Sequence, residues 1–325
     1  MTRGKRPVFV VGSPRSGTTF LYDALQSTGE FPVYNRESHV FSGLVTRVGN
    51  LSRRRNREKL LAKWLDSQYF KPIGVDVEEV KQRFLREGRN GGDFLRFVME
   101  DMACRQHVER WADHTPDHVL YMQQIKSTIP DALFIHLVRD GRDVALSLDK
   151  QGYLDSYLLD KRYGVMVCGI YWEWTVETGM KQGARIGDSY LEVRYEDLIG
   201  KPHETFARIG QFLDHEMDWE RIRSAGIGAV SKPNTSFNAG SNGGDFSPVN
   251  RWRTAFPEGD LRRFESMIGP SLQRFGYGLA TSDEELRKSR DLWALRSYYR
   301  LYFSFRLWIK ANNVPMAKFF VRDRA

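Results

Sequence analysis

The chain has 325 residues, 41% of them hydrophobic and 28% charged, so it is long enough to bury a large core and is not mainly disordered. Its formal net charge of +8 favours anionic partners such as phosphates, nucleic acid or a membrane surface. Only two cysteines are present, which excludes a disulfide scaffold and a cysteine-rich zinc site. The apolar run near the start is too short for a signal peptide, and no stretch is long enough to span a bilayer. We therefore expect a cytoplasmic protein.

Short apolar, β-branched runs alternate with helical patterns along the chain. This alternation predicts an α/β fold with a mostly parallel sheet that is covered by helices on both faces. We expect strands at residues 7–11, 111–114, 133–138 and 190–194, and helices at residues 18–27, 116–129, 142–148 and 203–213. Residues 44–110 are rich in charge and show helical spacing, which predicts a helical insertion or lid. Residues 234–256 contain several glycines and no regular period, which predicts a long functional loop.

The C-terminal segment, residues 287–325, contains ten Lys or Arg and two Asp, a surplus as large as the net charge of the whole chain. Residues 291–311 predict one helix, on which four cations share an arc of about 120°: Arg296, Arg300, Arg306 and Lys310. Aromatic and aliphatic side chains occupy the opposite face. Such a helix either lies in an anionic membrane interface or packs its aromatic face on the protein body or on a second subunit, with the arginines in solvent.

The most specific motif is the segment GSPRSGTT at residues 12–19, between a predicted strand and a predicted helix. Such a loop directs backbone N–H groups and a helix N-terminus at one point, which predicts a phosphate-binding site. The P-loop of nucleotide triphosphatases would require Lys at the position of Thr18. Here the cation is Arg15, inside the loop.

PRSGTTFL after an apolar strand resembles the 5′-phosphosulfate loop of sulfotransferases that use 3′-phosphoadenosine 5′-phosphosulfate (PAPS). LVRDGRDV, with Ser147 eight positions after Arg139, resembles the family's 3′-phosphate site. VRYEDL at residues 193–198 and SPVNRWR at residues 247–253 are similar to two further segments of that family. Four motifs in the same order are far more specific than one, and they cover roughly residues 6–275.

This resemblance implies a P-loop-like sulfotransferase fold over residues 1–280, followed by the basic aromatic segment 287–325. It implies PAPS as donor, adenosine 3′,5′-bisphosphate as product, and no metal. The implied acceptor is a small molecule, lipid or glycan, and nucleic acid is not expected as a partner. A homo-oligomer and peripheral membrane contact through residues 291–311 are both compatible with it. The residues implied to bind the donor are Arg15, Ser16, Gly17, Thr18, Thr19, Arg139, Ser147, Tyr195, Ser241, Asn250, Arg251 and Arg253.

Arg139 supports this assignment on physical grounds as well. It follows a buried strand, so it lies at the carboxyl edge of the sheet, where ligands bind in open α/β folds, and its planar fork suits a phosphate. The alternative is an ion pair with Asp140 or Asp143. Arg251 and Arg253 could bring two cations to the nucleotide from a loop, or could lie on a solvated rim.

Sulfuryl transfer needs a base, and the sequence offers three candidates. Glu37 lies 22 residues after Arg15, close to the spacing of the catalytic Glu in the protein-tyrosine branch of the family. His114, in DHTP, matches the catalytic His of the cytosolic small-molecule branch. His39 is two residues from Glu37. We rank Glu37 first, then His114, then His39, although an ordinary imidazole titrates closer to neutral pH than a carboxyl does.

Two other functions fit the pattern less well. The first is a P-loop kinase-like phosphotransferase. It is disfavoured because this sequence has neither the lysine of the P-loop motif nor a clear magnesium-binding Asp. The second is a nucleotide-binding or membrane-docking module without catalytic activity, which the presence of base candidates disfavours. No histidine and acidic cluster has the spacing of a zinc site.

Overall fold

The computed structural model describes residues 3–34, 36–67, 74–224, 248–256, 258–282, 284, 286 and 292–312. A four-stranded parallel sheet lies at its centre, in the order β2–β1–β3–β4. Its strands are β1 (Val8–Gly12), β2 (Ala112–Asp113), β3 (Leu133–Val138) and β4 (Tyr190–Arg194). All four predicted strands are therefore confirmed, the second in a shorter form.

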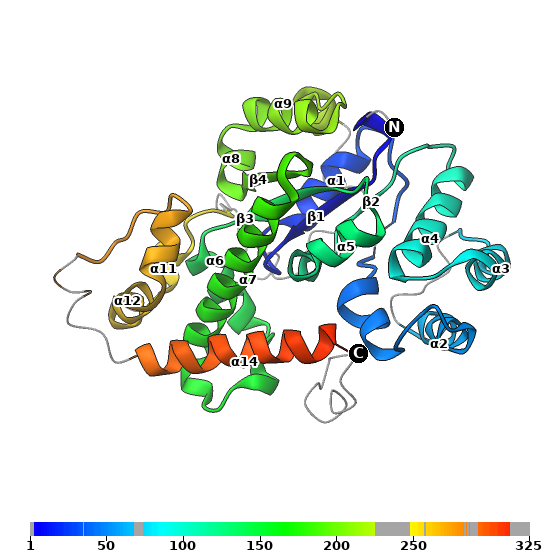
Figure 1. The fold of residues 1–325 in the computed structure, drawn as a ribbon. Coiled ribbons are helices and arrows are strands. Elements are labelled where there is room, and N and C mark those ends of the chain that lie inside the picture. Colours follow the sequence, from blue (N-terminus) through cyan, green and yellow to red (C-terminus); the bar gives the residue numbers. More distant parts are fainter. Residues whose placement is uncertain are drawn as a thin grey trace.

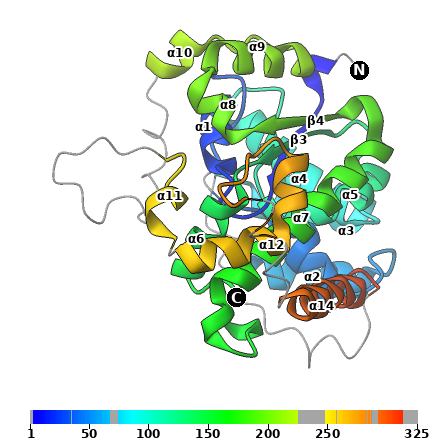
Figure 2. The same cartoon turned by 90° about the vertical axis from the view of Figure 1, so that its left-hand side faces the viewer.

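Helices cover both faces of this sheet (Figures 1 and 2). They are α1 (Thr18–Gln26), α2 (Arg54–Leu65), α3 (Val77–Glu87), α4 (Gly91–Arg105), α5 (Met122–Thr128), α6 (Gly141–Lys150), α7 (Gly164–Ile186), α8 (Tyr195–Gly200), α9 (Pro202–Leu213), α10 (Trp219–Ser224), α11 (Trp252–Ala255), α12 (Glu258–Arg274) and α14 (Trp293–Ala311). The predicted α/β class is thus confirmed. The predicted helix at residues 116–129 is divided at Tyr121 into a 3₁₀ helix, η4 (Pro116–Leu120), and α5.

Successive side chains of β1 point to opposite faces of the sheet, so they belong to two separate cores. Phe9 and Val11 belong to a cluster that contains residues of α2, α3, α4 and α5. Val8 and Val10 belong to a second cluster with residues of α1 and α9. Because the helices of residues 44–110 share a core with β1, that region is packed against the sheet and not separate from it.

The long helix α7 organises a third core together with α6, α12 and α14. Its residue Trp172 is fully buried, and the indole N–H donates to the backbone carbonyl of Arg139 at 3.0 Å. This bond fixes the chain where β3 ends and α6 begins. The third core therefore supports the carboxyl edge of the sheet from the side of α7.

The predicted C-terminal helix is present as α14 and ends at Ala311 as expected, but its orientation contradicts the reading in which the arginines lie in solvent. Arg296 and Arg300 face the protein and form ion pairs with the buried Glu173 of α7 at 2.8 and 2.7 Å. The expectation that Arg296 and Arg300 lie free in solvent was wrong. The cations are attracted inward by Glu173 and Glu177 of α7. The sequence of α14 alone does not show that these glutamates lie beneath it.

Candidate functional site

The loop between β1 and α1 is tightly wound. Ser13 and Ser16 are fully buried, and Arg15 and Gly17 have left-handed backbones with φ of 73° and 92°. A Cβ atom at Gly17 would lie 2.4 Å from the ring of Tyr195, so only glycine fits there. The loop leads directly into α1, whose first N–H groups have no intrahelical acceptors. The local geometry therefore provides the donors that an anionic group requires.

Arg15, Arg139 and Ser147 come together above this loop. The Nε of Arg15 donates to Ser147 Oγ at 3.0 Å, and Nη1 of Arg139 donates to the carbonyl oxygen of Arg15 at 3.0 Å. Burial, followed by the nearby charges of Arg139 and Arg251, lowers the pKa of Arg15, and Glu37 partly opposes this effect. Two cations, Arg139 and Arg251, and the Glu37 carboxylate are thus close enough to Arg15 to affect its charge.

Two buried polar atoms in this region have no hydrogen-bond partner within the structure: Ser16 Oγ and Arg139 Nε. Buried polar atoms are normally satisfied, because leaving one without a partner costs about 1–3 kcal/mol. An anion in contact with both the loop and Arg139 would satisfy them and balance the arginines. The residues present therefore fit the two phosphate groups of the expected donor.

Arg139 also contacts the ring of Tyr195, whose centroid lies 4.9 Å from the guanidinium carbon. The alternative ion pair of Arg139 with Asp140 does not form, because Asp140 pairs with Arg142 at 2.7 Å. Asp143 lies 3.9 Å from Arg139 Nη2, but its carboxylate mainly accepts hydrogen bonds from the backbone N–H groups of Asn250 and Trp252, at 3.0 and 2.8 Å. Asp143 thereby attaches the late loop to α6, a role that the sequence did not indicate.

The late loop places its two arginines differently. Arg251 is near enough to Arg15 to lower its pKa, whereas the guanidinium of Arg253 lies over the Trp252 ring at 4.6 Å. Arg142 also lies over that ring, at 3.6 Å, and lines a second cavity together with Arg253. Of the two arginines of the late loop, Arg251 is therefore the one that neighbours the first loop. Ser241 lies outside the residues that the structure describes.

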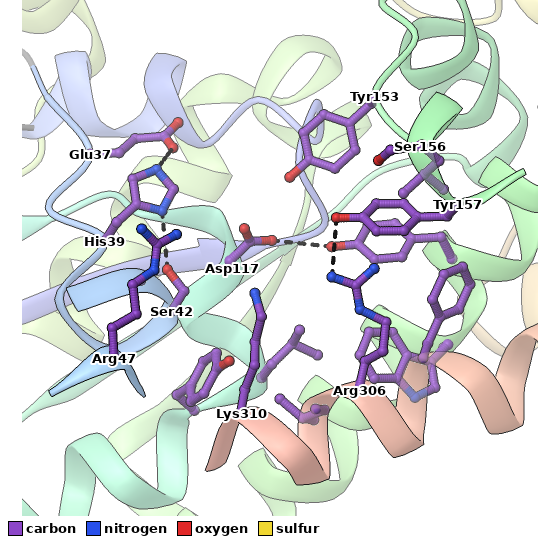
Figure 3. A pocket seen from close by; sticks show the side chains of 18 residues that line it. Glu37, His39, Ser42, Arg47, Asp117, Tyr153, Ser156, Tyr157, Arg306 and Lys310 are labelled. Atoms are coloured by element: carbon purple, nitrogen blue, oxygen red, sulfur yellow. Dashed lines mark hydrogen bonds and ion pairs between the residues drawn. The ribbon is translucent and has the colours of Figure 1, made fainter. Parts of the chain in front are cut away.

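A cavity of about 320 Å³ lies beside this cluster and contains Glu37 and His39 on one wall (Figure 3). The other walls come from the start of the helical insertion, from η4, from residues 153–157, from α7 and from the inner face of α14. The remaining lining residues are Ser42, Gly43, Arg47, Asp117, Leu120, Tyr121, Tyr153, Leu154, Ser156, Tyr157, Tyr171, Trp174, Phe303, Arg306, Leu307 and Lys310. Most of this surface is apolar or aromatic, with charged groups at separate points, as expected for a site that binds an organic molecule.

Glu37 and His39 form an ion pair in this cavity. His39 Nε2 lies 2.8 Å from the Glu37 carboxylate, and Nδ1 lies 3.0 Å from Ser42 Oγ. Burial alone would lower the pKa of His39, but the hydrogen bond and charge of Glu37, together with Asp117 and Asp113, outweigh it, so the pKa is raised. The imidazole therefore remains protonated to a higher pH than usual.

Thr115 links this pair to the end of β2. Its hydroxyl accepts hydrogen bonds from the N–H groups of Ser38 and His39, at 2.9 and 3.3 Å. Thr115 is held in turn by the buried Asp113, which also accepts from His118 Nδ1 at 2.9 Å. A threonine after a strand is too common a pattern to predict such a role from sequence.

His114 lies apart from the lining residues of the cavity. It is buried and stacks on Tyr22, with 4.0 Å between the ring centroids. Burial lowers its pKa, although Glu37 and Asp113 oppose the effect, so the imidazole is neutral at neutral pH. Its Nδ1 has no partner in the structure. The geometry therefore brings Glu37 and His39 to the cavity wall and leaves His114 beneath it.

Aromatic side chains form much of the lining. Tyr153, Tyr157, Tyr171 and Trp174 line the cavity, whereas Trp172 is a core residue. Asp117 accepts a hydrogen bond from Tyr171 at 3.2 Å, and burial raises its pKa. The inward Arg306 and Lys310 of α14 were not predicted as lining residues. Within the described ranges, no group of three metal-ligating side chains is present.

Comparison with known proteins gives the family of the chain. The family model described as "Sulfotransferase family" matches residues 7–220. The chain belongs to the sulfotransferase family. It is 25% identical over 211 residues to a "Putative protein-tyrosine sulfotransferase" of Caenorhabditis briggsae, covering 62% of this chain and 74% of the relative. It is 23% identical over 316 residues to carbohydrate sulfotransferase 1 of Rattus norvegicus, covering 88% of this chain and 71% of the relative.

The fold has a counterpart among solved structures as well. The sulfotransferase domain of the Synechococcus PCC 7002 olefin synthase superposes with a TM-score of 0.58 at 21% sequence identity. The superposition covers 84% of this chain and 95% of that domain. At this identity the similarity concerns the fold alone. Among the helices that the structure describes, none combines the length and the apolar character needed to cross a bilayer.

Proposed function

We propose that this sulfotransferase transfers a sulfuryl group from PAPS to a hydroxyl or amine of an acceptor bound in the 320 Å³ cavity. The observation that carries the proposal is the cluster of Arg15, Arg139 and Arg251 around a loop in which Ser16 Oγ is buried without a partner. Such a cluster is stabilised by a ligand with more than one negative charge. The charge of Glu37 reaches this cluster, so the donor side and the cavity adjoin.

In this proposal the first loop, with Ser16, Gly17, Thr18 and Thr19, holds the 5′-phosphosulfate end of the donor. Arg139 and Ser147 hold the 3′-phosphate, and Tyr195, Asn250 and Arg251 shape the neighbouring wall. Ser241 and Arg253 remain proposed contacts, although the guanidinium of Arg253 lies over the Trp252 ring and lines the second cavity. When bound, the donor supplies a sulfuryl group whose bond to the 5′-phosphate breaks as the acceptor oxygen bonds to sulfur.

Glu37 is the base in this proposal. Its side chain is 39% exposed and lines the cavity, where its carboxylate can take the proton of an acceptor hydroxyl. His39 orients that carboxylate through the 2.8 Å contact, and Thr115 fixes the backbone between them and β2. Arg15 balances the negative charge that develops on the donor side. His114 is the alternative base, since it is neutral and lies close enough to be affected by Glu37.

Binding of adenosine 3′,5′-bisphosphate tests the donor assignment. We expect this nucleotide to raise the melting temperature without metal and much more than ADP does, because only it carries a 3′-phosphate for Arg139 and Ser147. Arg139→Ala should abolish the difference between the two nucleotides. Equal stabilisation by both, or dependence on magnesium, would instead support the kinase-like phosphotransferase.

Turnover tests the reaction itself. Incubation with sulfur-labelled PAPS and cell extracts, followed by mass spectrometry of the labelled products, should identify the acceptor as a small molecule, a lipid or a glycan. A folded protein that binds the nucleotide but labels nothing in any fraction would support the inactive binding module.

A further inference from the structure

The outward face of α14 carries five large, exposed aromatic or aliphatic side chains along its length. Trp293 and Leu301 are 71% and 72% exposed, and Trp308 is 56% exposed. Tyr298 and Phe305 lie on the same face and are about half exposed. Large apolar side chains gathered on one surface usually mark a contact with a partner or a membrane.

Ion pairs with α7 hold the helix in this orientation. Glu173 is fully buried and contacts both Arg296 and Arg300, and Glu177 contacts Arg300 at 2.7 Å. Rotating the aromatic face inward would break these pairs and leave Glu173 as an unpaired buried charge, which is strongly unfavourable. The apolar face is therefore directed outward by the structure beneath it.

The inward side of α14 is attached to the segment before α7, since the backbone N–H of Leu159 donates to the hydroxyl of the buried Tyr299 at 2.9 Å. This bond also keeps the exposed side chains outward. We call these five residues, Trp293, Tyr298, Leu301, Phe305 and Trp308, the α14 face.

We propose that the α14 face docks on the surface of an anionic lipid bilayer. Trp and Tyr favour the interfacial region of a bilayer, because their rings are apolar and also carry a polar group. The sequence on each side of the helix supplies positive charge: residues 287–291 contain three cations and one Asp, and so do residues 313–325. Anionic head groups complement this charge, whereas the aromatic side chains enter the acyl boundary.

The size of the α14 face disfavours a second copy of the chain as its occupant. A helix of 19 residues is about 28 Å long, and one face of it is about 10 Å wide, which gives roughly 300 Å². A stable dimer buries about 800 Å² on each partner. A bilayer requires no such matching area, because it adapts to a single helix.

Docking would also bring the cavity to the membrane. Phe303, Arg306 and Lys310 on the inner side of α14 line it, and α14 forms one side of the molecule while α8 and α9 lie at the opposite end (Figure 1). Under the proposed function, an acceptor could then reach the cavity from the bilayer. The docking itself does not depend on that function.

Co-sedimentation of the full chain with vesicles tests the proposal. We expect the protein to pellet with phosphatidylcholine vesicles that contain phosphatidylglycerol, and several-fold less with phosphatidylcholine alone. The double variant Leu301→Glu with Trp308→Glu should require about tenfold more lipid for the same binding, because two charges enter the apolar face. Ile199→Glu, at a 37% exposed apolar position on α8, is the matched control and should bind as the unmodified protein does.

Any of three results would overturn the proposal. The first is that the unmodified protein stays in solution with anionic vesicles. The second is that the double variant pellets as well as the unmodified protein, and the third is that the unmodified protein is a dimer which the double substitution converts to a monomer. The milder Leu301→Gln variant, expected to weaken binding about threefold, replaces the double variant if the latter does not fold. Stabilisation by adenosine 3′,5′-bisphosphate is measured in parallel, so that a failure of the proposed function is distinguished from a failure of docking.

Discussion

The donor side and the acceptor cavity of this sulfotransferase are built in different ways. On the donor side, Arg15 follows β1, Arg139 follows β3 and Tyr195 follows β4, each within three residues of its strand. The walls of the cavity come instead from segments between residues 37 and 310 that share no motif. A parallel sheet brings its strand ends together whatever surrounds them, whereas the cavity exists only when α7 and α14 are packed.

This difference explains how the two sides can vary independently. The donor side recognises one ligand through short, local segments at a fixed sheet edge. The cavity takes its shape from side chains on α7, from residues 153–157 and from α14, which can change without moving the sheet. Substitutions on the donor side should therefore affect nucleotide binding and turnover, and substitutions around α14 should affect stability and the acceptor.

The largest effect is expected where the two sides meet, at Glu37. Glu37→Gln removes the proposed base, so turnover at saturating donor should fall by about 10²–10⁴ and the acidic limb of the pH–rate profile should become flat. His114→Ala is the comparison and should leave that limb in place. If His114→Ala flattens the limb and Glu37→Gln does not, the base is His114.

Arg15→Ala tests the donor side alone. It removes a cation placed beside Ser147 and Arg139, so turnover should fall by about 10²–10³ with little change in the melting temperature. Arg253→Ala is a control of equal charge and should reduce turnover much less, because its guanidinium lies over Trp252 on the second cavity. An equal loss of turnover in Arg15→Ala and Arg253→Ala would contradict the different positions given to the two arginines.

Glu173→Gln tests the support of α14. It leaves Arg296 and Arg300 with one fewer buried counter-charge, so the free energy of unfolding should fall by about 3 kcal/mol in urea titrations. Glu177→Gln should lower the free energy of unfolding by less than Glu173→Gln does, because Glu177 is partly exposed and pairs with Arg300 but not with Arg296. Both variants should keep their affinity for adenosine 3′,5′-bisphosphate if they remain folded. A loss of that affinity in folded protein would show that the two sides are coupled.

The smallest effect concerns the pH dependence of the Glu37–His39 pair. The pKa of His39 is raised above its ordinary value of 6.5, so its contribution to stability is full below pH 6.5 and is lost as the pH rises through the raised pKa. His39→Gln should remove this dependence from urea titrations at pH 5.5–8.5. His203→Gln, which removes an exposed histidine 3.3 Å from Glu220, should not change it. A dependence that survives His39→Gln must come from another group.

Much of the fold and of the donor side could be predicted from sequence, because the information is local. A buried strand is a short apolar run, and the residues after it lie at the carboxyl edge of the sheet wherever the strands pair. Arg15 and Arg139 were expected at this edge for that reason, whereas Ser147 and Tyr195 were expected from the resemblance to the family. The break in the predicted helix at Tyr121 was missed; there η4 packs against both β1 and α7, contacts that are distant in the sequence.

The sequence by itself determined the parallel sheet, the wound loop after β1 and the extent of α14. Only the tertiary structure decided which face of α14 is outward, because the answer depends on Glu173 and Glu177, more than 100 residues away in the chain. It likewise decided that Glu37 and His39 are at the cavity wall and that His114 is buried against Tyr22. Periodicity identifies the two faces of a helix, but the charges and cavities of its neighbours determine which face is buried.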